Sequence, residues 1–257
     1  AVAYLCWVKN LYNVGGDQAI AAFSFGTKLI KKADKVFGPG NQYVAEAKKQ
    51  LFGFIGIDLP AGPSEVLVIA NNKSNPAWIA YDVLAQGEHD PNAKTYVIAK
   101  NKNILLKVKN ELQRIMKETK LKNVDRSIKN NCYLILAKSQ KEIFEISNFI
   151  APEHLHIHEK FNKNILKHII NAGSVFLGER SPVALGDYTM GTNHVLPTDQ
   201  TAKFSSGLGV EDYTKKTVFI KPGNKTLKKI AKPTINLARQ EGLEAHALSV
   251  EIRKIKT

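Results

Sequence analysis

Four short segments of this 257-residue chain place metal-binding and acid–base side chains close together: residues 86–90, 151–155, 185–188 and 241–246. Imidazole nitrogens, carboxylate oxygens and amide oxygens can all bind a divalent cation. A carboxylate beside an imidazole can also divide two proton transfers between them. Together these side chains are typical of a metal-assisted enzyme site, with Gln86, His89, Asp187 and His246 as candidate ligands and Glu153 and His154 as candidate acid–base groups.

The first segment places Gln86 and His89 three residues apart. On a helix this spacing puts both side chains on one face, where they can point at one ion. A histidine at a helix end is more often a capping or packing residue, and a neutral glutamine is an uncommon zinc donor. Glu88 or Asp90 could serve instead, and the spacing excludes neither.

In the second segment, Glu153 and His154 follow a proline at the mouth of a short predicted strand. Catalytic side chains of parallel sheets are usually carried at such a strand end. His156 and His158 share the strand face of His154, so a metal site of three alternating histidines is an alternative. Exposed alternating histidines are the commoner situation.

The last two segments have purely structural alternatives. Asp187 lies between a glycine and a tyrosine, where an Asx turn is the ordinary reason for an aspartate. His246 lies near the C-terminus on a predicted helix, where an exposed histidine needs no explanation.

The elements that must position these residues alternate between strand and helix. Strands are predicted at 11–14, 66–69, 95–99, 132–137 and 218–220, and helices at 17–26, 42–51, 76–89, 104–118, 141–149, 227–239 and 241–254. Asn41 is placed to cap the second helix, and Ser139 with Glu142 forms a predicted capping box. Residues 173–210 are rich in Gly, Ser and Pro and are expected to be irregular and to line a site. Alternating strands and helices predict an α/β fold with a parallel sheet.

Composition narrows the class of protein. The net charge is +14, but the lysines are scattered over helix faces without interleaved aromatic residues, which favours a solvated surface over nucleic-acid binding. Cys6 and Cys132 match no metal or redox spacing and indicate a reducing compartment, so the cytoplasm is expected. No apolar run reaches the roughly 20 residues that cross a bilayer, so no membrane partner is expected. The chain starts without Met inside an apolar stretch, which indicates a fragment.

Eight motifs, in order along the whole chain, closely resemble the histidinol dehydrogenase family. They are Gly-Pro-Gly-Asn at 38–41, Ala-Gly-Pro-Ser-Glu-Val at 61–66, Gln-Gly-Glu-His-Asp at 86–90, Ala-Pro-Glu-His-Leu at 151–155, Asn-Ala-Gly-Ser at 171–174, Asn-His-Val-Leu-Pro-Thr at 193–198, Phe-Ser-Ser-Gly-Leu at 204–208 and Glu-Gly-Leu at 241–243. The resemblance implies oxidation of L-histidinol through L-histidinal to L-histidine with two NAD, at a zinc site in an intertwined homodimer. It also implies an α/β fold of two incomplete Rossmann-like lobes with a small helical C-terminal tail.

The same resemblance assigns roles to residues. One zinc per subunit would be held by Gln86, His89, Asp187 and His246, which also surround the substrate together with Ser64, His154 and Glu241. His154 would take the alcohol proton, and Glu153 would activate the water that hydrates the aldehyde. NAD would contact Gln18 and Asn41. The implied domains are an NAD-side lobe at 1–62, a lobe with the zinc and catalytic residues at 63–208, and a dimerisation tail at 209–257.

Some features depart from the family pattern. No G-x-G-x-x-G follows a strand, so NAD would be held at the glycine turns 15–16 and 38–41. Asp17, Thr192 and the pair Asp199-Gln200 stand where the family usually has other residues, and a substantial N-terminal portion of family members has no counterpart here. The alternative to an active enzyme is therefore an inactive or partner-dependent fragment of one.

Overall fold

The computed structural model describes residues 1–60, 62–119, 121, 124–158 and 163–253. The chain divides into two compact units, Ala1–Tyr213 and Thr214–Thr257. Within the described residues, no helix is both long and apolar enough to cross a membrane.

The first unit is built on a five-stranded, all-parallel sheet in the order β5-β4-β3-β6-β7. Its strands are β3 Glu65–Ile69, β4 Lys94–Ala99, β5 Cys132–Leu136, β6 His154–Ile157 and β7 Ser174–Leu177. The chain adds strands outward from β3 to β5 and then returns to add β6 on the other side of β3. All five residues of β3 are buried, as expected for a strand covered on both faces.

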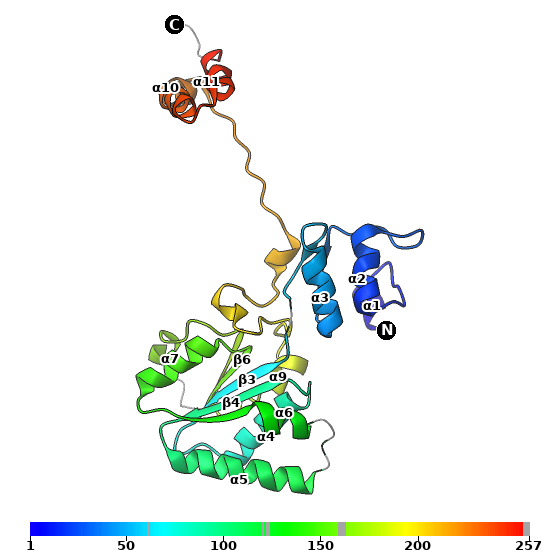
Figure 1. Ribbon diagram of the computed structural model, residues 1–257, viewed down its shortest axis with the longest axis vertical. Coiled ribbons are helices and arrows are strands. Elements are labelled where there is room, and N and C mark those ends of the chain that lie inside the picture. The colour runs from blue at the N-terminus through cyan, green and yellow to red at the C-terminus, as the bar shows by residue number, and fades with distance from the viewer. Residues whose placement is uncertain (61, 120, 122–123, 159–162, 254–257) are drawn as a thin grey trace. The chain divides into compact units, whose positions relative to one another are not determined.

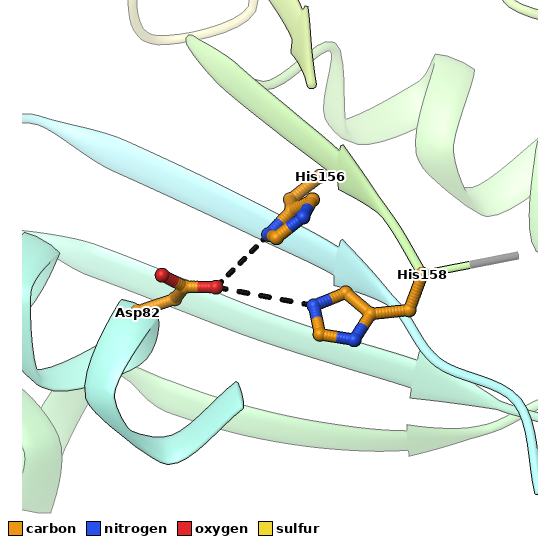
Figure 2. Close-up of side chains that lie close together, drawn as sticks. All are labelled: Asp82, His156 and His158. Carbon is orange, nitrogen blue, oxygen red and sulfur yellow. Dashed lines mark hydrogen bonds and ion pairs between the residues drawn. The ribbon is translucent and has the colours of Figure 1, made fainter. Parts of the chain in front are cut away.

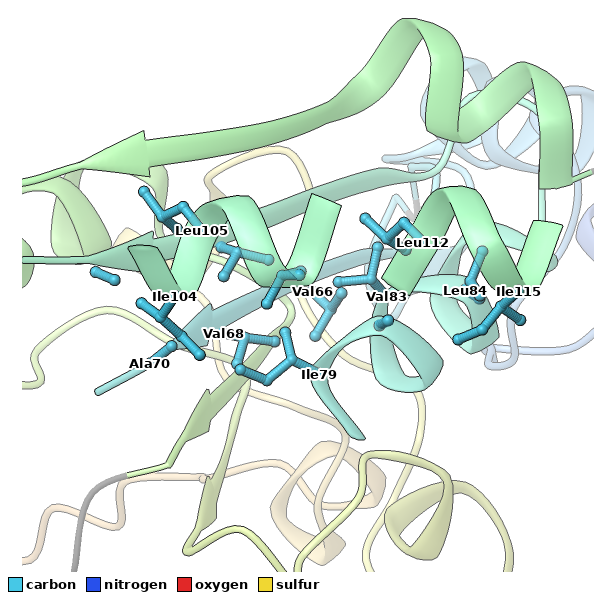
Figure 3. Close-up of a cluster of buried hydrophobic side chains, with 14 of the residues drawn as sticks. Val66, Val68, Ala70, Ile79, Val83, Leu84, Ile104, Leu105, Leu112 and Ile115 are labelled. Carbon is cyan, nitrogen blue, oxygen red and sulfur yellow. The ribbon is translucent and has the colours of Figure 1, made fainter. Parts of the chain in front are cut away.

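Helices cover both faces of this sheet (Figure 1). On one face lie α4 Pro76–Gly87, α5 Lys102–Glu118 and α6 Val124–Asn131; on the other lies α7 Gln140–Ile150. Val66 and Val68 of β3 pack among apolar side chains of α4 and α5 (Figure 3). Leu67 and Ile69 point the other way, toward α7. Alternate residues of one strand therefore build two separate cores.

Local hydrogen bonds fix where several helices begin. The Asn41 side chain accepts from the backbone N–H groups of Tyr43 and Val44 and caps α3 Gln42–Leu51. Ser139 caps α7 by accepting from the Glu142 N–H. The Glu142 carboxylate accepts from the backbone N–H of Lys138. In a full capping box it would accept from the N–H of Ser139, one residue later. Both predicted caps are therefore present, the second in a shifted form.

Near the N-terminus lie α1 Val2–Leu5, α2 Gly16–Phe25 and a small parallel pair, β1 Lys35–Val36 with β2 Gly56–Ile57. The strand predicted at 11–14 is wrong: this segment has no regular secondary structure and pairs with no described strand. An apolar run needs a hydrogen-bonding neighbour to become a strand, and here Tyr12 instead packs edge-on against Phe23 of α2.

A buried ion pair holds the turn before α3. Lys48 Nζ lies 2.6 Å from Asp58 Oδ1, and the two side chains are 3% and 1% exposed. The other Asp58 oxygen accepts from the Gly38 N–H, while Lys48 donates to the Gly38 carbonyl. Gly38 has φ +123°, a conformation that glycine adopts readily.

Replacing Lys48 with Met should therefore lower the free energy of unfolding by about 3–5 kcal/mol, because the Asp58 charge would stay buried without its partner. Denaturant unfolding measures the change. Lys49→Met is the matched control, since Lys49 is the exposed neighbour on the same helix and should change stability little. Equal effects of the two substitutions would contradict the role of the pair.

The later part of the chain is mostly irregular, as predicted for 173–210, although β7 and α9 Ala184–Tyr188 lie within it. The short helices α8 Lys163–Leu166, η1 Thr201–Lys203 and η2 Val210–Tyr213 complete the first unit. The second unit contains α10 Asn224–Gln240 and α11 Glu244–Glu251; the last residue of the predicted helix 241–254 lies outside the described residues. The strand predicted at 218–220 is wrong, because all three side chains are more than 80% exposed and none belongs to a described strand.

The fold class is confirmed as α/β, with two parallel sheets and a helical C-terminal part. The domain limits at 62 and 208 stay predictions.

Candidate functional site

A cavity of about 470 Å³ lies at the amino ends of β3 and β6. Its wall includes Ser64, Gln86, His89, Glu153, His154, Asp187 and His194. Parallel sheets usually carry their catalytic side chains at the carboxyl ends of their strands. The sequence led us to expect the site at such strand ends, but the cavity lies at the amino ends. The reason is the direction of α4, which runs antiparallel to the strands. Its C-terminal end, with Gln86 and the following His89, therefore lies at the amino ends of the strands.

His154 begins β6 and is 4% exposed. Its Nδ1 lies 3.3 Å from the Glu65 carbonyl, to which an Nδ1–H can donate. This tautomer leaves Nε2 with a free lone pair, 3.9 Å from Asp187 Oδ1, and both residues line the cavity. Burial lowers the pKa of His154, although the nearby Asp187 carboxylate opposes the shift. His154 is therefore a neutral imidazole suited to accept a proton.

Glu153 precedes β6 and is 6% exposed. One carboxylate oxygen, Oε2, accepts from the Glu65 N–H at 2.9 Å and lies 3.6 Å from His154 Nδ1. Burial raises the pKa of Glu153 to about 8, and the hydrogen bond from Glu65 only partly offsets the effect. Its carboxyl group can therefore gain or lose a proton near neutral pH.

The backbone of one residue orients both acid–base candidates. Glu65 donates its N–H to Glu153 and accepts at its carbonyl from His154. Gly173 permits this packing, because a Cβ there would lie 2.6 Å from the Glu153 carbonyl oxygen. The Glu65 side chain is buried, and Lys94 Nζ lies 3.3 Å from its Oε1 and 2.5 Å from Asp199 Oδ1. Burial raises the pKa of Glu65, and Lys94 counteracts it.

Three of the four predicted zinc ligands line the same cavity. Gln86 is buried in the last turn of α4, His89 is exposed just beyond that helix, and Asp187 is half-buried in α9. They offer an amide, an imidazole and a carboxylate, a donor set that fits a divalent cation. The fourth, His246, is exposed on α11 in the second unit, and its role stays a prediction.

The other predicted contacts lie in different places. Ser64 lines the cavity just before β3. Asn41 caps α3 and lines an adjoining cavity of about 780 Å³, which shares Ser64 and His89 with the first. Gln18 is exposed in α2, and Glu241 is exposed at the end of α10 in the second unit. These contacts too stay predictions.

The alternative metal site, made of His154, His156 and His158 together, does not form. His154 faces the cavity, whereas His156 and His158 turn toward Asp82 of α4 (Figure 2). Burial raises the pKa of Asp82, but the two imidazoles beside it lower that pKa to below its usual value overall. Three buried groups therefore form a separate cluster, which we call the Asp82 cluster.

Sequence reasoning missed Glu65, Asp82 and His194. Asp82 was detectable in part, because it precedes Gln86 by four residues and so shares its helix face. His194 lies in one of the eight motifs, but no spacing marks it as a cavity residue. Glu65 acts through its backbone, which leaves no signal in the identity of the residue.

The raised pKa of Glu153 predicts how stability depends on pH in the zinc-free protein. Between the usual value of 4.5 and about 8, the folded state binds a proton that the unfolded state has lost. Stability should therefore fall as pH rises through this window, by roughly 5 kcal/mol at most. Gln cannot ionise. The free energy of unfolding of Glu153→Gln, measured by denaturant unfolding, should therefore rise relative to that of the unmodified protein as the pH increases from 5 to 9. Parallel pH profiles would contradict the assignment.

Comparison with known proteins places this geometry in a family. A profile described as "Histidinol dehydrogenase" matches residues 1–254. The chain is 46% identical to histidinol dehydrogenase from Listeria monocytogenes, covering 98% of this chain and 60% of that protein. It is 44% identical to histidinol dehydrogenase from Bacillus cereus, covering 98% and 59%. The chain thus spans about 60% of the length of these relatives.

A solved structure supports the same relationship. The crystal structure of histidinol dehydrogenase from Elizabethkingia anophelis superposes with a TM-score of 0.91 at 40% identity. The match covers 98% of this chain and 58% of that one. Sequence and fold agree over nearly all of the present chain, which belongs to the histidinol dehydrogenase family.

Proposed function

We propose that this chain carries the active site of a zinc-dependent, NAD-linked dehydrogenase that oxidises L-histidinol through L-histidinal to L-histidine. Family membership supports the reaction class. The observation that carries the proposal is the buried pair Glu153 and His154, oriented by one backbone and facing the cavity lined by Gln86, His89 and Asp187.

His154 is suited to the first oxidation. The substrate hydroxyl must lose a proton as its carbon gives a hydride to NAD, and a base must accept that proton. A buried imidazole with Nδ1–H held by the Glu65 carbonyl presents Nε2 as the acceptor. Burial lowers its pKa, which favours the neutral form that this role requires.

Glu153 is suited to the second oxidation. The aldehyde must be hydrated before it can give up a second hydride, and hydration needs a base that takes a proton from water. A carboxylate with an ordinary pKa is a weak base at neutral pH. Burial raises the pKa of Glu153 to about 8, which makes its ionised form a much stronger base.

Zinc would be held at Gln86, His89 and Asp187, with His246 as the fourth ligand. When bound, it supplies a Lewis acid that orients the substrate and lowers the pKa of its hydroxyl. NAD would lie in the adjoining cavity, where the N-terminus of α3 capped by Asn41 and the side chain of Arg126 suit its phosphates. The shared residues Ser64 and His89 connect this cavity with the acid–base pair.

We further propose that the complete protein is an intertwined homodimer of the cytoplasm. The 214–257 unit would be its dimerisation part and would supply Glu241 and His246 to the substrate and the zinc. The free thiols Cys6 and Cys132 are consistent with a reducing compartment.

Replacing His89 with Ala tests the zinc assignment. The zinc content of the purified full-length protein should fall by one ion per chain, and NADH formation from L-histidinol should be lost with it. In the unmodified protein, zinc affinity should weaken as pH falls through the histidine range, because imidazole binds metal only when neutral. His168→Ala is the control, since His168 is exposed and stacks on Phe144. An unchanged zinc content in His89→Ala would contradict the ligand assignment.

A further inference from the structure

The Asp82 cluster lies on the same face of β6 as His154, but toward the other end of the strand. His156 and His158 are alternate residues and so point the same way, toward α4. Asp82 lies one helical turn before Gln86. All three are buried, with 8%, 0% and 2% of Asp82, His156 and His158 exposed. None of them lines the cavity at the amino ends of the strands.

His156 has an acceptor at each ring nitrogen. Nε2 lies 3.0 Å from the Gly178 carbonyl oxygen, and Nδ1 lies 2.9 Å from Asp82 Oδ2. Because a carbonyl only accepts, Nε2 must carry a hydrogen. The neutral ring then turns the Nδ1 lone pair toward a carboxylate oxygen, so a proton or a metal cation must lie between the two atoms. A second proton, shared by His156 and Asp82, would do this, and so would a metal cation.

The surroundings of His158 distinguish a second proton from a metal cation. Among the residues that the structure describes, neither of its buried ring nitrogens has a hydrogen-bond partner. Nε2 lies 3.9 Å from the same Asp82 Oδ2, too far for a hydrogen bond. A second proton on His156 would leave His158 unsatisfied, whereas a cation bound by all three residues would satisfy it as well. Figure 2 shows both imidazoles directed at the one carboxylate.

We propose that Asp82, His156 and His158 bind a divalent transition-metal cation, with zinc as the metal that these ligands suit, at a second site separate from the catalytic cavity. The three donor atoms lie within 4.8 Å of one another. Ligands about 2.1 Å from one ion lie about 3–3.5 Å apart, so small side-chain movements would complete the coordination.

Two further features support this metal site. The Gly178 carbonyl holds the Nε2–H of His156, and metal-binding histidines commonly donate their second nitrogen to such a carbonyl. His158 directly follows β6 and donates its N–H to Ile69 at the end of β3. The site therefore lies at the carboxyl ends of β3 and β6, where the strand order reverses and parallel sheets usually bind ligands.

The bound ion would be structural. It would join α4, which carries Gln86, to β6, which carries His154, and so hold the two walls of the catalytic cavity together. This inference does not depend on the reaction proposed above, because the Asp82 cluster contains none of the residues to which that reaction is assigned.

Metal content per chain tests the site in untagged full-length protein, after dialysis against a weak chelator. We expect two zinc ions in the unmodified protein, one in His158→Gln, one in His89→Ala, and none in the double variant. His168→Gln makes the same chemical change at an exposed position and should retain two. Unchanged zinc in His89→Ala would contradict only the catalytic ligand assignment.

A zinc content in His158→Gln equal to that of the unmodified protein would overturn the second site. If His158→Gln does not fold, His89→Ala loaded with Co²⁺ provides the test, because that variant leaves the Asp82 cluster intact. One tightly held Co²⁺ per chain, with the visible absorption of histidine-bound cobalt, supports the proposal. No bound Co²⁺ overturns it and leaves Asp82 and His156 as a buried ion pair.

Discussion

Replacing His154 with Asn should lower NADH formation from L-histidinol by about 10²- to 10⁴-fold, the usual contribution of a general base. Asn retains a side chain that can donate to the Glu65 carbonyl, so the local packing should persist. It has no nitrogen lone pair for the proton of the substrate hydroxyl. The loss should appear in kcat more than in KM, because the proton moves only as the reaction proceeds.

Zinc content provides the control for this variant, since the loss of rate should occur with the metal still bound. At saturating zinc, the rate with L-histidinol should fall off at a lower pH than an ordinary histidine base would give, because burial lowers the pKa of His154. A variant that retains more than about a tenth of the rate would show that another group, or water, accepts the proton.

Replacing Glu153 with Gln should slow the oxidation of L-histidinal by about 10²-fold or more, and that of L-histidinol by much less. Gln can still accept from the Glu65 N–H, so its position is retained while its basicity is lost. Only the second oxidation needs a base for water. Supplying each substrate separately with NAD, and comparing single-turnover rates, measures the two steps independently.

The exposed residue Glu145 on α7 offers a matched control, and Glu145→Gln should leave both rates unchanged. In the unmodified enzyme, the rate with L-histidinal should rise with pH as Glu153 ionises. Bound zinc would move this rise below the value of about 8 that burial alone produces, because a nearby cation favours the carboxylate. Equal losses in both oxidations would show that Glu153 does not separate the two steps.

Local patterns in the sequence determined most of the regular structure. The Asn41 cap, the buried run at the centre of β3 and the periodicity of α5 each depend on residues within a few positions of one another. These elements were predicted with ends within about two residues, because helix caps and hydrophobic periodicity act over short distances. The segments 11–14 and 218–220 carry the same apolar signal and form no strand, since a strand also requires a neighbour.

The sequence also indicated which residues belong to the candidate site, but their arrangement depended on contacts between distant parts of the chain. The register that pairs Val66 with His154 brings the backbone of Glu65 to Glu153, 88 residues away. The direction of α4 places the cavity at the amino ends of the strands. The same pairing turns His156 and His158 toward Asp82 and away from the site with His154. Strand register and helix direction result from the packing of the whole sheet, so only the tertiary structure decided which histidine faces the cavity and which joins the Asp82 cluster.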